Sequence, residues 1–123
     1  MQQILKTVSY LHHKGLVHRD IKTENILIDG SDNSIKIIDF GLSKFIEEGE
    51  KCTDRQGTPY YLAPEVLIKN YDRKCDIWSC GIVMYIMLSG RPPFNAESDL
   101  EIMRLIKIGD FAMSGKVWNN VSQ

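Results

Sequence analysis

The sequence predicts a mainly α-helical domain that also contains short β-hairpins, and three patterns lead to this fold class. Residues 1–14 carry apolar side chains three and four positions apart, which is the spacing of one helix face. Residues 75–88 are apolar on nearly every face, which predicts a central helix. Between these segments, isoleucine-rich runs flank a stretch of turn-forming residues, and this arrangement is typical of a hairpin.

The first part of the chain is expected to contain one helix followed by the hairpin. Gly15 stands directly after the amphipathic segment and marks the end of the helix. Residues 18–25 form a polar turn, and residues 26–28 and 35–38 are the predicted strands. The residues between the strands read DGSDNS and are strong turn formers, so the strands are expected to pair with each other.

The second part begins with a segment that shows no regular pattern. Residues 41–57 are rich in charges and bracketed by glycines, which predicts a mobile loop without helix or strand. After the central helix, Ser98 and Glu101 form a capping box that opens a further helix through residue 108. We expect the core to include these large side chains from the central helix and the turn after it: Trp78, Met84, Met87 and Phe94.

Length, composition and charge restrict the class of function. The 123 residues suffice for one domain. Hydrophobic residues make up 43% and charged residues 25%, with a net charge of −1, which excludes a polybasic nucleic-acid binder. The longest apolar run falls short of the roughly 20 residues of a membrane helix, so no membrane partner is expected. The three cysteines lack metal-site spacing, which indicates free thiols, a reducing compartment and a cytoplasmic location.

Polar side chains suited to metal-assisted chemistry stand at the ends of the predicted strands. Asn25 precedes the first strand and Asp39 follows the second, so the hairpin brings both to one end. Such a small set of oxygens suits Mg²⁺, which combines a few protein oxygens with phosphate and water. Asp20 is then the carboxylate left to orient or deprotonate a hydroxyl, and Lys22 reaches the same phosphate as a point charge. This spacing favours metal-assisted phosphoryl transfer.

Several motifs match one known family in order and spacing. Residues 18–25, HRDIKTEN, resemble the catalytic loop of protein kinases, with Ile21 for the commoner Leu and Thr23 for the commoner Pro. Residues 39–41, DFG, resemble the magnesium-binding triplet of that family, and residues 63–65, APE, resemble its APE triplet. Any one triplet would be weak support, but the full set covers essentially the whole chain.

The resemblance is to the C-terminal lobe of the family. It implies that residues 1–123 are a partial kinase domain, a truncated C-lobe running from the helix before the catalytic loop to just after the helix that follows GRPPF. A lysine at position 22, two residues after Asp20, resembles the serine/threonine branch of the family and not the tyrosine branch. The first helix, residues 60–67 (YYLAPEVL) and residues 118–122 (WNNVS) resemble the calcium-dependent and calmodulin-regulated kinases.

The resemblance also implies a role for each residue that matches a motif. Asp20 would accept or steer the proton of the substrate hydroxyl, and Lys22 would neutralise the transferring phosphoryl group. Asn25 and Asp39 would hold Mg²⁺ beside ATP. Thr58 resembles the threonine that bonds to the catalytic Asp and Lys in serine/threonine kinases.

Further residues would shape the nucleotide and substrate sites. Leu27 would form the lower face of the adenine pocket, and Glu24 would lie near the ribose and near basic residues of a protein substrate that carries Ser or Thr. Asp76 would brace the backbone of the catalytic loop from the central helix. His18 is expected in the core. His12 and His13 are expected at an exposed helix end.

The loop before the APE triplet carries a predicted switch. Many kinases phosphorylate a threonine there, and its phosphate pairs with the arginine that precedes the catalytic Asp, here Arg19. Counting back from the Gly-Thr pair, that position holds Asp54, whose carboxylate can pair with Arg19 without modification. The competing reading is phosphorylation of Thr53.

Some parts of a complete kinase have no match in the chain. These are the glycine-rich turn over the ATP phosphates, the strand lysine and the helix glutamate. Glu65 would also lack the family's pairing arginine, and one charge left alone costs about 3–5 kcal/mol. We therefore expect the chain alone to be poorly stable and inactive. Two other functions stay open: a non-catalytic module that docks a partner through residues 58–61 and 98–108, and a small-molecule phosphotransferase, which residues 57–65 disfavour.

Overall fold

The computed structural model describes residues 1–119 and 121, a mixture of helices and small sheets that agrees with the predicted fold class. The helices are α1 (Gln2–His13), α2 (Pro64–Leu67), α3 (Lys74–Ser89) and α4 (Asp99–Ile108). The strands are β1 (Leu16–Val17), β2 (Ile26–Ile28), β3 (Ile35–Ile37) and β4 (Lys44–Phe45). The described residues also contain the 3₁₀ turns η1 (Thr23–Asn25), η2 (Pro59–Tyr61) and η3 (Lys116–Trp118). Asn120 and Ser122 of the WNNVS ending lie outside the described residues.

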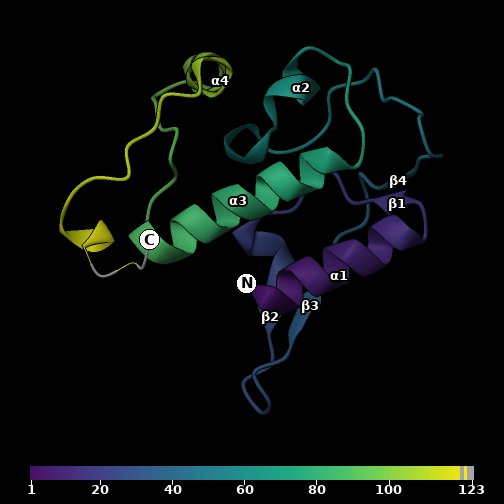
Figure 1. Ribbon diagram of the computed structural model, residues 1–123, viewed down its shortest axis with the longest axis horizontal. Coiled ribbons are helices and arrows are strands. Elements are labelled where there is room, and N and C mark those ends of the chain that lie inside the picture. Colours follow the sequence, from purple (N-terminus) through teal and green to yellow (C-terminus); the bar gives the residue numbers. More distant parts are fainter. Residues whose placement is uncertain (120, 122–123) are drawn as a thin grey trace.

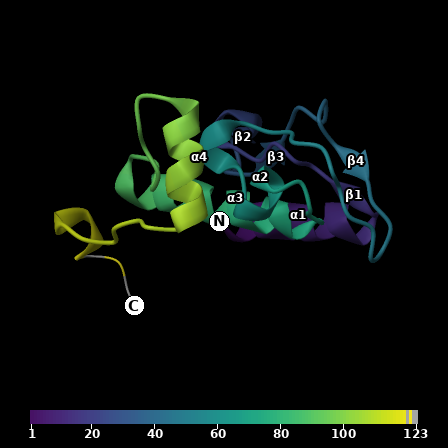
Figure 2. The same ribbon diagram turned by 90° about the horizontal axis from the view of Figure 1, so that it is seen from above.

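Helices α1 and α3 lie side by side, and the β2–β3 hairpin extends below α1 in the view of Figure 1. The apolar face predicted for α1 is buried through Ile4, Val8 and Leu11. Gly15 adopts a positive φ of 73°, the left-handed conformation that favours glycine, directly after the helix. Helix α4 stands across the direction of the other two helices (Figure 2).

The predicted hairpin is present and positions the candidate site. Strands β2 and β3 pair antiparallel, with Ile26 opposite Ile37 and Ile28 opposite Ile35. Strand β3 ends one residue earlier than predicted, but Ile38 still donates its backbone N–H to the carbonyl of Asn25 at 2.9 Å. The residues that flank the two strands are therefore tied together at one end of the hairpin.

The prediction that residues 41–57 contain no regular element is wrong. Strand β4 lies in this segment and pairs antiparallel with β1, Val17 opposite Lys44. Further along, Cys52 and Tyr71 form an isolated antiparallel bridge. Both pairings are too short to produce a periodic pattern, and both partners are distant in sequence. The loop is thus fixed at two points.

The core consists of two hydrophobic clusters that meet at Leu67 and Trp78. The first cluster joins α1, β3, η2, α3 and α4, and it includes Val8, Ile21, Tyr61, Val83, Phe94 and Ile106. The second cluster lies under the loop and α2, and it includes Val17, Leu62, Val66, Tyr71 and Cys75. Along the chain, Asp20 lies between Val17 of the second cluster and Ile21 of the first.

Helix α3 is less buried than its all-round apolar pattern predicts. Its buried residues lie between Cys75 and Val83, but Ile77 is 49% exposed. Met84 is 46% exposed and Met87 is 60% exposed, so their placement in the core is wrong. Among the described residues, α1, η2 and η3 make the main contacts with α3, and they leave one face open. Phe94 is buried as predicted, whereas Trp78 is half-buried at the junction of the clusters.

The capping residue of α4 and the free cysteines agree with the predictions, but the capping box is only half formed. Ser98 caps α4 by accepting the N–H of Glu101 at 3.3 Å, although the Glu101 side chain pairs with Arg104 instead of closing the box. The cysteines Cys52, Cys75 and Cys80 are free and buried. Within the described part of the chain, we find no helix with the length and hydrophobicity needed to span a membrane.

Candidate active site

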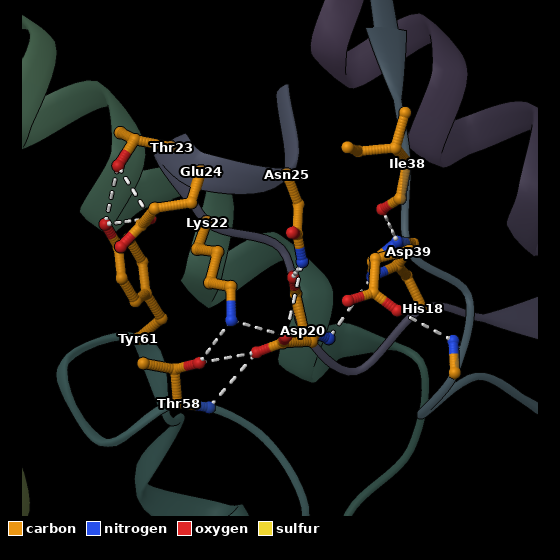
Figure 3. Close-up of polar contacts among 11 residues, drawn as sticks. His18, Asp20, Lys22, Thr23, Glu24, Asn25, Ile38, Asp39, Thr58 and Tyr61 are labelled. Carbon is orange, nitrogen blue, oxygen red and sulfur yellow. Dashed lines mark hydrogen bonds and ion pairs between the residues drawn. The ribbon is translucent and has the colours of Figure 1, made fainter. Parts of the chain in front are cut away.

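Asp20 lies at the centre of the polar cluster shown in Figure 3, and its side chain is buried. Thr58 donates to Oδ1 of Asp20 twice, through its hydroxyl at 2.8 Å and its backbone N–H at 3.2 Å. On the other carboxyl oxygen, Oδ2, Lys22 pairs through Nζ at 2.8 Å, and Asn25 donates through Nδ2 at 3.2 Å. The carboxylate is therefore held on both oxygens by segments far apart in sequence.

The charge of this carboxylate is stabilised by its donors. Burial by itself would raise the pKa of Asp20, but the hydrogen bonds from Lys22, Thr58 and Asn25 hold that pKa below its ordinary value. The bond to Asp20 raises the pKa of Lys22. Lys22 also donates to the Thr58 hydroxyl at 2.9 Å, which closes a triangle of three side chains. Asp20 is thus ionised at neutral pH and can accept a proton or a hydrogen bond.

Asn25 and Asp39 flank the paired end of the hairpin, as predicted. Asn25 is buried, and its Nδ2 donates to the backbone carbonyl of Asp20 at 2.9 Å as well as to the carboxylate. Asp39 has a positive φ of 63°, and its Oδ1 accepts the N–H of Gly41 at 3.2 Å. His18, buried as predicted, contacts the carbonyl of the intervening Ile38 at 3.1 Å.

The oxygens at this end of the hairpin fit a magnesium–nucleotide complex. Both side-chain hydrogen bonds of Asn25 use its nitrogen, and no described residue donates to its Oδ1. Residues 1–119 and 121 contain no group of three or more His, Cys, Asp or Glu side chains that could hold a metal by themselves. A donor set of one amide oxygen and one or two carboxylates is the kind that Mg²⁺ completes with phosphate oxygens and water.

The backbone before Asp20 is fixed by Asp76, a fully buried residue of α3. Its Oδ2 accepts the N–H of His18 at 2.9 Å, and its Oδ1 accepts the N–H of Arg19 at 2.8 Å. His12 places Nε2 2.8 Å from the same Oδ2, so the prediction that His12 belongs to an exposed helix end is wrong. His13 is exposed as predicted. The error arose because the partner of His12 lies 64 residues away.

Arg19 connects the catalytic segment to the loop. Its Nη1 lies 2.9 Å from Oδ2 of Asp54, which is the pairing predicted from the sequence. Its Nε donates to the carbonyl of Leu42 at 2.6 Å, and its Nη1 also donates to the hydroxyl of Tyr71 at 3.2 Å. Burial works to raise the pKa of Asp54, but the charge of Arg19 keeps that pKa below its ordinary value.

Gly57 allows the loop to approach the catalytic segment closely. Its φ is 116°, and a Cβ at this position would lie 2.8 Å from the carbonyl oxygen of Arg19 and 2.8 Å from Leu62. The first neighbour is backbone and cannot move aside, and the second is the end of a buried side chain, Leu62. Only glycine lets Thr58 reach Asp20 from this direction.

Glu24 and Leu27 lie at the edge of the cluster. Glu24 is exposed, and its Oε2 accepts hydrogen bonds from Thr23 at 2.9 Å and from the Tyr61 hydroxyl at 3.3 Å. Leu27 is 50% exposed, so its side chain is available to a ligand. Among the described residues, no ion pair involves Glu65. The contacts of the Tyr61 hydroxyl with Thr23 and Glu24 were not predicted, because a single tyrosine near the APE triplet carries no local signal for them.

Comparison with known proteins identifies the family. The model of the protein kinase domain matches residues 1–123. The chain is 46% identical over 125 residues to calcium-dependent protein kinase 4 of Plasmodium falciparum, covering 99% of this chain and 24% of that protein. It is 47% identical over 126 residues to calcium-dependent protein kinase 3 of Plasmodium berghei, covering 100% of this chain and 23% of that protein. The chain thus spans about a quarter of the length of these relatives.

The chain belongs to the protein kinase family. Within that family its similarity is to the calcium-dependent serine/threonine branch, as its motifs indicated.

Proposed function

We propose that this chain carries the catalytic centre of a serine/threonine protein kinase and corresponds to the C-terminal lobe of its domain. The observation that supports this function best is the triangle of Asp20, Lys22 and Thr58 at the paired end of the hairpin. An ionised carboxylate, an ammonium and a hydroxyl meet beside the oxygens of Asn25 and Asp39. In a protein kinase these groups take part in transfer of the γ-phosphoryl group of ATP to a Ser or Thr hydroxyl.

Each residue of the triangle has a distinct part in this proposal. Asp20 accepts a hydrogen bond from the substrate hydroxyl and then its proton, because its lowered pKa keeps it ionised. Lys22 presents a positive charge to the phosphoryl group as negative charge develops on it. Thr58 holds Asp20 and Lys22 in one geometry and links them to the substrate-facing loop. Positioned groups of this kind typically contribute ~10²–10⁴-fold in rate.

The nucleotide and metal would bind at the paired end of the hairpin. Asn25 and Asp39 would hold Mg²⁺, with Lys22 and Glu24 beside the nucleotide and Leu27 below the adenine. Bound Mg²⁺ neutralises the phosphates and orients them for transfer.

The exposed Glu24 suggests which substrate the kinase takes, and the names of the similar proteins suggest how it is regulated. Glu24 is exposed and ionised beside Tyr61, so it favours a basic residue near the target hydroxyl. The similar Plasmodium proteins are named calcium-dependent kinases, and we extend calcium control to the protein that carries this chain.

A graft tests the proposed function. This chain replaces the matching 125 residues of calcium-dependent protein kinase 4 of Plasmodium falciparum, and transfer of labelled phosphate from ATP to a basic Ser/Thr peptide is measured. The grafted kinase is expected to be active with calcium, and Asp20→Asn is expected to lower kcat by at least ~10²-fold. A folded but inactive grafted kinase would overturn the proposal.

Calorimetry on the chain alone separates the two classes of function. Weak binding of Mg²⁺–ATP that disappears in Asp39→Asn supports the nucleotide site. A folded chain that binds no Mg²⁺–ATP, together with an inactive grafted kinase, would favour the non-catalytic interaction module.

A further inference from the structure

The ion pair between Arg19 and Asp54 is partly open to solvent, and by itself it is expected to contribute little to the order of the loop. The Asp54 side chain is 44% exposed, and ion pairs that face solvent typically contribute only about 0–1 kcal/mol. The Arg19 side chain is 9% exposed, so it meets Asp54 at the edge of the buried region. A further group on the buried side would hold the carboxylate in one position.

Tyr71 lies on that buried side and is only 1% exposed. Its hydroxyl accepts the N–H of Arg19 Nη1 at 3.2 Å and donates to Oδ1 of Asp54 at 3.2 Å. The hydroxyl therefore binds both charged partners at once, as acceptor to the cation and as donor to the anion. Phenylalanine would fill the same space and could do neither.

The backbone of Tyr71 holds the same part of the loop. Its N–H donates to the carbonyl of Cys52 at 3.3 Å, and the N–H of Cys52 donates to its carbonyl at 2.7 Å. Cys52 stands two residues before Asp54, so the bridge ties the backbone close to this carboxylate to Tyr71. The ring packs in the second hydrophobic cluster, which anchors the residue.

We propose that Tyr71 is a positioning residue that, through Arg19, holds Asp54 and the loop before Thr58 in the ordered conformation without phosphorylation. The hydroxyl completes a three-member group, Arg19–Tyr71–Asp54, that replaces a phosphate at this point. The consequence for catalysis rests on the proposed function, but the ordering of the loop does not.

Hydrogen exchange of the loop amides tests the ordering directly. Exchange of residues 52–58 is followed by mass spectrometry in Tyr71→Phe, in Asp54→Asn and in the double variant, both in the chain alone and in the grafted kinase. Each single variant is expected to speed exchange about 10-fold, since a hydrogen bond to a charged group is lost. In the Asp54→Asn background, Tyr71→Phe is expected to add less than about 2-fold, because the two residues act as one unit.

A matched control uses another tyrosine. Tyr10 is 63% exposed, so Tyr10→Phe removes the same hydroxyl without touching the loop, and loop exchange should not change. Unchanged exchange in Tyr71→Phe would overturn the proposal. Additive effects in the double variant would also overturn it, because the hydroxyl would then act apart from Asp54. Global unfolding of Tyr71→Phe by circular dichroism would show a role in overall stability instead, and would overturn it as well.

Kinetics of the grafted kinase add a second readout. Displacement of the loop is expected to raise KM for the peptide about 3- to 10-fold and to leave KM for ATP unchanged, because Thr58 leads into the substrate-facing segment. A fall in kcat alone would indicate only a smaller folded fraction and would contradict the positioning role. If the unaltered grafted kinase is inactive, the proposed function fails. The hydrogen-exchange pattern still tests whether Tyr71 orders the loop.

Discussion

The hydroxyl of Thr58 donates a 2.8 Å hydrogen bond to Oδ1 of Asp20, across 38 residues of sequence. The backbone N–H of Thr58 reaches the same oxygen, so two donors from one residue converge on one carboxyl atom. The contact joins the loop that ends at Gly57 to the segment that carries Asp20. The contact therefore links the end of the loop to the segment that carries Asp20.

Replacing Thr58 tests the importance of this contact. Thr58→Val keeps the shape of the side chain and removes the hydroxyl, which leaves Asp20 and Lys22 without their shared partner. We expect kcat of the grafted kinase to fall about 10- to 100-fold, as for a lost hydrogen bond to a charged group. Thr58→Ser should recover most of the rate, and a fully active Thr58→Val variant would contradict the role.

The lowered pKa of Asp20 predicts how stability depends on pH. Because the folded-state pKa lies below the ordinary value of 3.8, the carboxylate stabilises the fold fully above that value. This contribution is lost as the pH falls through the folded-state pKa. Urea unfolding between pH 3 and 7 should show a shallower loss of stability toward acid in Asp20→Asn than in the unaltered chain. Identical slopes would mean that Asp20 is not stabilised in its charged form.

Gly57 is expected to tolerate no side chain. Gly57→Ala places a methyl group against the backbone oxygen of Arg19 in addition to the backbone strain at its positive φ. Strain of this kind typically costs about 1–3 kcal/mol, and the contact adds to it. Gly49→Ala is the matched control, because Gly49 also has a positive φ, 85°, but no neighbour within 4 Å of its Cβ position. Equal losses in free energy of unfolding for the two variants would exclude the close approach as the cause.

His12 is expected to stabilise the chain through Asp76. His12→Ala removes one partner of a buried carboxyl group, which typically costs about 1–3 kcal/mol. The adjacent His13 is exposed and bonds only within its own helix, to the carbonyl of Ser9, so His13→Ala should change stability by no more than about 0.5 kcal/mol. The free energy of unfolding of both variants is measured by chemical denaturation. Equal values for the two variants would show that the His12 contact contributes nothing to stability.

The elements that could be predicted from the sequence are those with a local signal. Helix α1 shows its apolar face within a few turns, and the β2–β3 hairpin shows its turn residues. The cap of α4 at Ser98 was predicted for the same reason. Most of the candidate site was also predictable, because Asp20, Lys22 and Asn25 lie within six residues of each other and match one motif.

The features that could not be predicted depend on partners distant in sequence. The β1–β4 pairing involves two residues on each side, too few for an alternating pattern. His12 and Tyr71 look like ordinary surface or core residues until the fold brings Asp76 and Arg19 to them. The predicted burial of Met84 and Met87 was wrong for another reason. A hydrophobic side chain is buried only when another part of the molecule covers its face of the helix.

The two hydrophobic clusters have a mechanical consequence for the site. Val17 belongs to one cluster and Ile21 to the other, so the segment that carries Asp20 crosses the boundary between them. The segment after Thr58 crosses it too, at Tyr61 and Leu62. Both segments that meet at the Asp20–Thr58 contact are therefore anchored in both clusters. The distance between the carboxylate and the threonine thus depends on how the two halves of the interior pack against each other, and not only on the residues that line the site.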